Sequence, residues 1–170
     1  VLVAVARRAR RAGVAVKLGA ADISPLALSE TAARVKAAGF VCDTYERDAV
    51  RDAAPEGYDV IMSSLFLHHL ETPGVVRVLG AMAGAARRGV VVSDLARTAI
   101  GLFMSRAAPR LVTRSRGVHV DAVRSVEAAL TGDELLAASR EAGMHGAEVR
   151  SVWPERSLLR WRTPEAGRVD

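Results

Sequence analysis

Residues 58–70 read YDVIMSSLFLHHL, and this stretch gives the clearest indication of the fold. An aromatic residue and an aspartate lead into the apolar run 60–62, which is followed by two serines and then by His68 and His69. A short apolar run between polar residues predicts a buried strand over residues 58–63, followed by a loop over residues 64–73.

Helices and strands are predicted to alternate around this stretch. Glycines end the helical patterns, and Ser24 followed by Pro25 is typical of a helix start. We expect helices at 1–12, 25–38 and 74–88 and strands at 14–23, 41–47 and 89–93, with a strand at 1–6 as the alternative for the first helix. This alternation predicts a parallel sheet in an α/β fold.

The chain beyond Asp94 has a different character. The apolar segment 95–111 is predicted to be either a lid over an apolar substrate or a core helix. Two helices and two strands are expected after it, at 118–130, 133–142 (capped by Thr131), 147–153 and 157–161. A connection as short as that between the two strands joins only antiparallel neighbours. We expect one domain over residues 1–162 and a frayed tail over residues 163–170.

Composition limits the class of protein. The chain has 170 residues, of which 50% are hydrophobic, and its net charge is +5. The arginines are scattered and no aromatic residues accompany them in a stripe, so we expect no nucleic-acid partner. No apolar run approaches the about 20 residues of a membrane helix, so we expect no stable membrane insertion. The single cysteine, Cys42, excludes an internal disulfide and a cysteine-based zinc site, and we expect a cytoplasmic protein.

Two aspartates follow neighbouring strands of the predicted sheet. Asp22 comes where the strand at 14–23 meets the next helix, and Asp48 follows the strand at 41–47. Ligands of open α/β sheets bind beyond the carboxyl ends of the strands, and an acidic residue about 20 positions after a glycine-rich turn binds ribose hydroxyls. Counting back from Asp22 puts such a turn at or before Val1, so we expect the chain to be truncated there. A helix-capping role for Asp22 and a solvated loop position for Asp48 are the alternatives.

Four segments, in order, resemble motifs of class I S-adenosylmethionine-dependent methyltransferases of the small-molecule type. They are Ala21–Leu28 (ADISPLAL), Arg47–Ala49 (RDA), Tyr58–Leu70 (YDVIMSSLFLHHL) and Arg87–Leu95 (RRGVVVSDL). The resemblance covers residues 1–162 and implies a Rossmann-like, doubly wound α/β sheet that ends in an antiparallel hairpin. The family's first strand and its glycine-rich loop are absent, so we expect the strands that end at Asp22 and Ser63 to flank a gap.

The resemblance also implies a cofactor site for S-adenosylmethionine. Asp22 is expected to bind the ribose, and Ile23 to pack on the adenine. Asp48 and Ala49 are expected to bound the adenine pocket. The residues expected to line the methionine part of the cofactor and the exit of the methyl group are Ser63, Ser64 and Leu65.

His68 and His69 are the candidate general bases. A phenol or hydroxyl acceptor has to lose a proton, and imidazole titrates near neutral pH. Adjacent helical residues point in different directions, so at most one of the two faces the substrate. The alternative is that these histidines only pack or cap. Two adjacent histidines without carboxylate partners make a poor metal site, so we expect no metal.

Residues after the strand at 89–93 are the candidate acceptor contacts, because family members place substrate-binding elements there. They are Asp94, Arg97, His119 and Arg124. The two arginines are suited to an anionic acceptor. Surface salt bridging is the alternative for each of the four.

The expected reaction is methyl transfer to a small-molecule acceptor of phenolic, quinone or polyketide type, on oxygen or carbon. A nicotinamide-dependent oxidoreductase is an alternative, although the antiparallel hairpin and the absence of a Tyr-x-x-x-Lys pair argue against it. The other alternative is a non-catalytic interaction module derived from a methyltransferase. The sequence does not indicate an oligomeric state.

Overall fold

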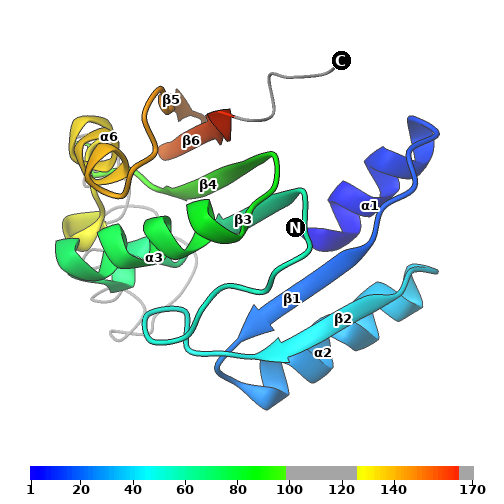
Figure 1. Ribbon diagram of the computed structural model, residues 1–170. Coiled ribbons are helices and arrows are strands. Elements are labelled where there is room, and N and C mark those ends of the chain that lie inside the picture. Colours follow the sequence, from blue (N-terminus) through cyan, green and yellow to red (C-terminus); the bar gives the residue numbers. More distant parts are fainter. Residues whose placement is uncertain (99–125, 165–170) are drawn as a thin grey trace, which may run out of the picture. The chain divides into compact units, whose positions relative to one another are not determined.

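The structure of the chain is a computed structural model that describes residues 1–98 and 126–164 (Figure 1). The chain forms two compact units, residues Val1–Tyr58 and Asp59–Asp170. We describe each unit by itself. None of the helices in the described part of the chain is long and apolar enough to cross a membrane.

The first unit is a two-stranded parallel sheet with two helices. Its elements are α1 (Leu2–Arg11), β1 (Leu18–Asp22), α2 (Pro25–Ala37) and β2 (Cys42–Glu46). The strands pair in register from Leu18 opposite Cys42 to Asp22 opposite Glu46. Because the strands are parallel, both of their carboxyl ends lie at one edge of this sheet.

Local signals explain the boundaries of the first unit. The Ser24 hydroxyl accepts a hydrogen bond from the Ala27 backbone N–H and caps α2, and Pro25 occupies its first turn. Gly39 follows α2 with a φ of +78°, a conformation that glycine adopts without strain. Ala6, Leu18 and Val35 are the buried centre of this unit.

The second unit is a four-stranded mixed sheet in the order β3-β4-β6-β5. Its elements are β3 (Val60–Ser64), the 3₁₀ turn η1 (Leu67–His69), α3 (Thr72–Ala85), β4 (Gly89–Leu95), α6 (Gly132–Glu141), β5 (Glu148–Val152) and β6 (Arg156–Arg162). Strands β3 and β4 are parallel, and β6 pairs antiparallel with both β4 and β5.

Helices α3 and α6 pack against each other and against this sheet, α3 on β4 and α6 on β5 and β6 (Figure 1). Aliphatic side chains fill the space between them. The buried hydrophobic residues of these elements are Val75, Val78, Leu79, Met82, Val90, Val92, Leu135, Ala138, Leu159 and Trp161. The alternating burial along β4 leaves Val91 and Ser93 on the other side of the sheet.

The α/β class, the parallel pairs and the antiparallel hairpin of the sequence prediction are confirmed. Strands β1 and β3 belong to different sheets, so these two strands are not hydrogen-bonded neighbours, as expected. Thr163 was expected in the frayed tail, but its N–H and hydroxyl donate to the carbonyls of Arg88 and Arg87 at 3.1 and 2.8 Å. The segment 95–111 lies outside the described residues beyond Thr98.

Candidate functional site

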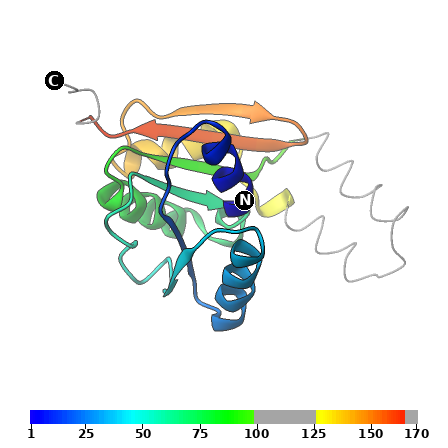
Figure 2. The ribbon, with the colours of Figure 1, turned by 90° about the vertical axis from the view of Figure 1, so that its right-hand side faces the viewer.

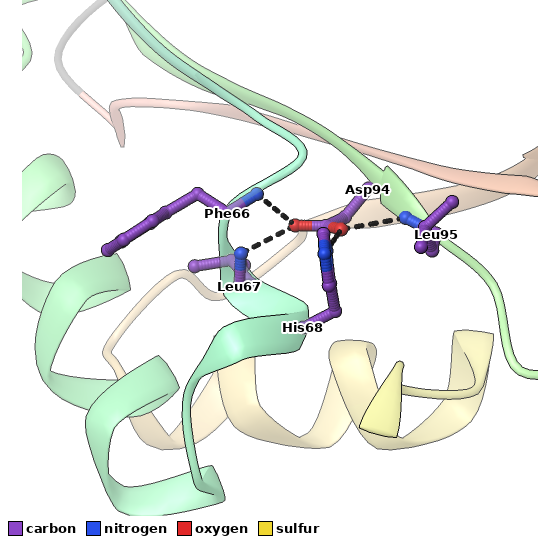
Figure 3. A network of polar contacts seen from close by, with 5 residues as sticks. All are labelled: Phe66, Leu67, His68, Asp94 and Leu95. Atoms are coloured by element: carbon purple, nitrogen blue, oxygen red, sulfur yellow. Dashed lines mark hydrogen bonds and ion pairs between the residues drawn. The ribbon is translucent and has the colours of Figure 1, made fainter. Parts of the chain in front are cut away.

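Asp94 occupies the carboxyl end of β4 and is the centre of a polar network (Figure 3). Asp94 is buried, with only 4% of its surface exposed to solvent. One carboxylate oxygen, Oδ2, accepts the backbone N–H groups of Phe66 and Leu67 at 3.0 and 2.6 Å. The other, Oδ1, lies 2.6 Å from Nδ1 of His68 and accepts the N–H of Leu95 at 2.7 Å. This carboxylate therefore ties the loop after β3 to the end of β4.

The ring of His68 is buried against Asp94, with its side chain 6% exposed. A carboxylate surrounded by N–H donors acts as an acceptor, so Nδ1 carries the hydrogen and donates it. In neutral imidazole, Nε2 is then the nitrogen with a free lone pair. Among the described residues no buried side-chain nitrogen or oxygen lacks a partner, and the ring's one hydrogen bond there runs through Nδ1.

The backbone between β3 and η1 is strained. Leu65 has a φ of +57°, in the left-handed region, which costs a residue with a side chain roughly 1–2 kcal/mol. Its N–H donates to the Ser93 carbonyl at 3.0 Å, and the next two N–H groups bind Asp94. These bonds to the end of β4 hold the turn in place. Ser63 and Ser64 are half-buried in the last two positions of β3, and Leu65 is 41% exposed.

In the first unit, the two predicted aspartates lie at the same edge of the β1–β2 sheet. Asp22 ends β1, and Asp48 comes two residues after Glu46, the register partner of Asp22. The Arg47 N–H also donates to the Asp22 carbonyl at 3.0 Å. Asp22 is exposed, and its Oδ1 accepts the Ser24 N–H at 2.8 Å. The sequence prediction that these two strand ends are adjacent agrees with this register.

Asp48 is engaged within its own turn. Its Oδ1 accepts the Val50 N–H at 2.9 Å, and its Oδ2 lies 3.6 Å from Nε of Arg51. Ile23 and Ala49, the predicted apolar walls of an adenine pocket, are both exposed, Ile23 by 66%.

Of the four predicted acceptor contacts, Asp94 and Arg97 lie within the described residues, and both are engaged within the protein. Asp94 is buried and bound to the loop after β3, a position that argues against direct contact with a substrate. Arg97 forms an ion pair with Glu134 and donates to the Glu127 carbonyl, so its guanidinium is engaged within the protein. His119 and Arg124 lie outside the described residues.

His69 is exposed, and its ring centroid lies 4.0 Å from that of His68. No carboxylate contact of His69 is found in the described part of the chain. Within residues 1–98 and 126–164 there is no group of three or more His, Cys, Asp or Glu side chains that could hold a metal ion.

Sequence analysis missed the pairing of His68 with Asp94 and assigned the two residues separate roles. A signal for it exists: each follows one of two buried strands, and the carboxyl ends of parallel neighbours meet at one edge of a sheet. The hydrogen bond itself links residues 26 positions apart and depends on the register of β3 with β4.

No protein-family model and no curated protein matches the sequence. Solved structures match it by shape. The S-adenosylmethionine-dependent methyltransferase SibL, in its apo form, superimposes with a TM-score of 0.70 at 16% identity over 96% of this chain and 47% of that chain. An O-methyltransferase family 2 protein from Planctomyces limnophilus, solved in complex with apigenin, superimposes with a TM-score of 0.67 at 14% identity. The match covers 95% of this chain and 46% of that chain.

The magnesium protoporphyrin IX methyltransferase of Synechocystis, with bound SAH, gives a TM-score of 0.55 at 16% identity over 86% of this chain and 63% of that chain. The chain thus spans about half the length of the first two proteins. At these identities the likeness concerns the fold: the chain has the α/β fold of class I S-adenosylmethionine-dependent methyltransferases.

Proposed function

We propose that the chain belongs to an S-adenosylmethionine-dependent methyltransferase that acts on a hydroxyl group of a small molecule. The observation that carries this proposal is the His68–Asp94 pair at the carboxyl ends of β3 and β4, in a chain with the fold of such enzymes. The reaction requires a base beside the acceptor, and this pair supplies one.

The first unit is proposed to bind the adenosine part of the cofactor. When bound, the cofactor supplies an electrophilic methyl group on a sulfonium sulfur. Asp22 fits ribose hydroxyls because it is exposed and no hydrogen bond to its Oδ2 is found among the described residues. Ile23 presents an exposed apolar surface beside it, which suits one face of an adenine ring. Asp48 and Ala49 are proposed to bound the adenine from β2.

The second unit is proposed to orient and deprotonate the acceptor. Asp94 holds the His68 ring through Nδ1, which leaves the lone pair of Nε2 to take the proton of the acceptor hydroxyl. The acceptor oxygen then attacks the methyl carbon as the carbon–sulfur bond breaks. Leu65 and the serines at the end of β3 are proposed to line the methionine part of the cofactor. Within the described part of the chain His69 has no comparable orienting partner, so His68 is the favoured base.

A phenolic acceptor is the favoured class. The structure from Planctomyces limnophilus was determined with apigenin, which is a phenol. A phenol loses its proton more readily than an alcohol and so matches a single imidazole base near neutral pH. A quinol or a polyketide phenol offers the same chemistry.

The test is the transfer of a labelled methyl group from S-adenosylmethionine to a panel of phenols, by the wild type and three variants. We expect His68→Gln to lower kcat by about 10²–10⁴-fold while the affinity for S-adenosylhomocysteine stays unchanged. Asp94→Asn should lower kcat as well, because an amide at this position no longer fixes the Nδ1–H tautomer. His69→Gln should keep most of the activity.

Wild-type activity from the His68→Gln variant would show that the base is misassigned. Absence of both methyl transfer and S-adenosylhomocysteine binding, in this chain and also in a form extended upstream of Val1, would refute the enzyme proposal itself.

A further inference from the structure

Trp153 is the most exposed large hydrophobic residue of the described chain, at 87%. The sequence contains two tryptophans, and the other one, Trp161, is buried as large apolar side chains usually are. Trp161 is 8% exposed, and its indole N–H donates to the His145 carbonyl at 3.1 Å. An exposed indole forgoes the burial of one of the largest apolar side chains, so its position needs an explanation.

The register of the sheet places Trp153 at the edge of the sheet that holds the His68–Asp94 pair. Trp153 begins the turn between β5 and β6, and the first residue of β6, Arg156, pairs with Leu95 at the end of β4. Asp94 itself pairs with Ser157. Figures 1 and 2 show β6 beside β4, with its turn at the end where β4 finishes. The turn therefore lies at the same end of the sheet as Asp94, the residue that holds the His68 ring.

Contacts to the chain just after β4 fix this turn. The Ala96 N–H donates to the Glu155 carbonyl at 3.0 Å, and the Thr98 hydroxyl donates to the Glu155 carboxylate. Glu155 has a φ of +47°, a left-handed conformation that a residue with a side chain holds only when its surroundings impose it. The indole is thus presented on an anchored turn.

A cavity of about 190 Å³ lies in the same part of the second unit. Residues of β5, β6, α6 and the chain after β4 line it, among them Ala96, Ser151 and Ser157, while Trp153 itself does not. Val152, next to Trp153, is 41% exposed. Such a cavity is smaller than the roughly 300–1,000 Å³ of a complete ligand site, so it accommodates part of a molecule.

We propose that Trp153 is a specificity-determining residue that contacts the aromatic ring of the acceptor. This inference rests on the proposed methyl transfer and deepens it by naming the residue that selects aromatic acceptors. An indole held at the base-bearing edge offers a planar apolar face, and aromatic rings pack on such a face in offset or edge-to-face geometry. Such packing of the acceptor ring does not require a charged side chain. Arg97, the nearby arginine, is already paired with Glu134 within the protein.

The first experiment measures binding. The full chain is labelled with 5-fluorotryptophan, which gives two ¹⁹F resonances, and Trp161→Phe assigns them. The probes are 2-naphthol and decahydro-2-naphthol, which share ring size and hydroxyl but differ in aromaticity. We expect 2-naphthol to shift the Trp153 signal at lower concentration than decahydro-2-naphthol does. A Trp153 signal that neither probe moves, or that both move equally, would overturn the inference.

The second experiment compares Trp153→Ala with Trp153→Phe and with Val41→Ala, a control that truncates another exposed apolar residue, at 85% exposure, in the first unit. For 2-naphthol we expect Trp153→Ala to weaken binding, or raise KM, about three- to tenfold with kcat nearly unchanged. Trp153→Phe should restore most of the loss, and Val41→Ala should match the wild type.

Unchanged KM and unchanged 2-naphthol affinity in Trp153→Ala would overturn the role of Trp153 while leaving the methyltransferase intact. Absence of S-adenosylhomocysteine binding and of all methyl transfer, in the wild type and also in a form extended upstream of Val1, refutes the proposed function instead. Shifts that are equal for Trp153 and for the buried Trp161 signal would indicate general adhesion of the probe and would also count against the inference.

Discussion

At the scale of single residues, Asp94 combines burial with four hydrogen-bond donors. Removing the carboxylate leaves buried N–H groups without an acceptor, which is among the costliest kinds of substitution. We expect Asp94→Ala to lower the free energy of unfolding by about 3 kcal/mol or more, measured by urea denaturation. Asp59→Ala, an exposed aspartate of the same unit, is the control and should change it by less than about 0.5 kcal/mol. Equal effects of the two variants would mean that the Asp94 network is not formed.

Tyr58 gives a second test at this scale. Burial, followed by its hydrogen bonds with the Tyr45 hydroxyl at 3.0 Å and with Asp43, raises the pKa of Tyr58 above its ordinary value. A raised pKa in the folded state means that this stabilisation is complete below the unfolded pKa of about 10 and is lost as pH rises above it. Wild type should therefore exceed Tyr58→Phe in stability at pH 8, and the difference should shrink above pH of about 10.

Tyrosinate absorbance provides the second readout, because the chain has only two tyrosines. Tyr58→Phe should remove the phase that titrates at the highest pH. A stability difference that stays constant across this range would contradict the part-buried hydrogen bonds of Tyr58.

At the scale of elements, Gly89 shows how closely β4 and β6 approach. A Cβ at this position would lie 2.3 Å from the backbone oxygen of Trp161, so one strand has to move. We expect Gly89→Ala to destabilise the protein by roughly 1–3 kcal/mol, the cost of overpacking. Gly84→Ala is the matched control: no atom lies within 4 Å of its added Cβ, and alanine in α3 should stabilise by about 0.5–1 kcal/mol. Thermal melting that ranks the two variants the other way would contradict the β4–β6 register.

The start of α6 carries a capping box. The Thr131 hydroxyl accepts the Glu134 N–H at 3.2 Å, and the Glu134 carboxylate accepts the Thr131 N–H at 2.9 Å. The backbone hydrogen bond from Thr131 and the charge of Arg97 lower the pKa of Glu134. A lowered folded pKa contributes stability above the unfolded value of about 4.3, and this contribution is lost as pH falls through the folded value.

We therefore expect Glu134→Gln to be less stable than the wild type at pH 7, with a difference that shrinks as pH falls below about 4.3. Thr131→Ala should cost about 1 kcal/mol at pH 7. Chemical denaturation at pH 7 and at pH 3 measures the stability of each variant relative to the wild type. A Glu134→Gln difference that grows on acidification would contradict the capping box.

Local sequence signals predicted most elements, and the exceptions have physical causes. The caps at Ser24 and Thr131 were readable because the capping atoms lie within three residues of their donors. Residues 14–17 were expected in a strand, but β1 starts at Leu18, where its partner β2 starts at Cys42. The helix expected at 74–88 ends at Ala85, because the Arg88 and Gly89 N–H groups donate to the Asp59 carbonyl.

The loop after β3 illustrates what a local pattern cannot reveal. The sequence predicts an irregular loop over residues 64–73, yet residues Leu67–His69 form the turn η1. Hydrogen bonds from Phe66 and Leu67 to Asp94 hold it, and these span 28 and 27 positions. The same long-range register brings His68 to Asp94, so His68 was predictable as a candidate base, while the hydrogen bond to Asp94 depends on the register of β3 with β4.

At the scale of the whole molecule, the chain consists of two compact units with different proposed tasks. Residues 1–58 contain the adjacent strand ends at Asp22 and Asp48, which are proposed to hold adenosine. Residues 59–170 contain the proposed base and its orienting carboxylate. The sequence motifs predicted the adenosine-binding residues in the first part of the chain and the candidate base in the second part. The fold comparison shows the fold alone, and the individual site residues stay predictions.

Binding of the demethylated cofactor tests this assignment most directly. Isothermal titration calorimetry of the full chain with S-adenosylhomocysteine should give one site per chain, and NADH should give no heat of binding. Asp22→Asn should weaken the affinity for S-adenosylhomocysteine by about tenfold or more, because a hydrogen bond to a charged group contributes about 1.5–3 kcal/mol. Binding of NADH in place of S-adenosylhomocysteine, or an affinity that Asp22→Asn leaves unchanged, would contradict the proposed adenosine site.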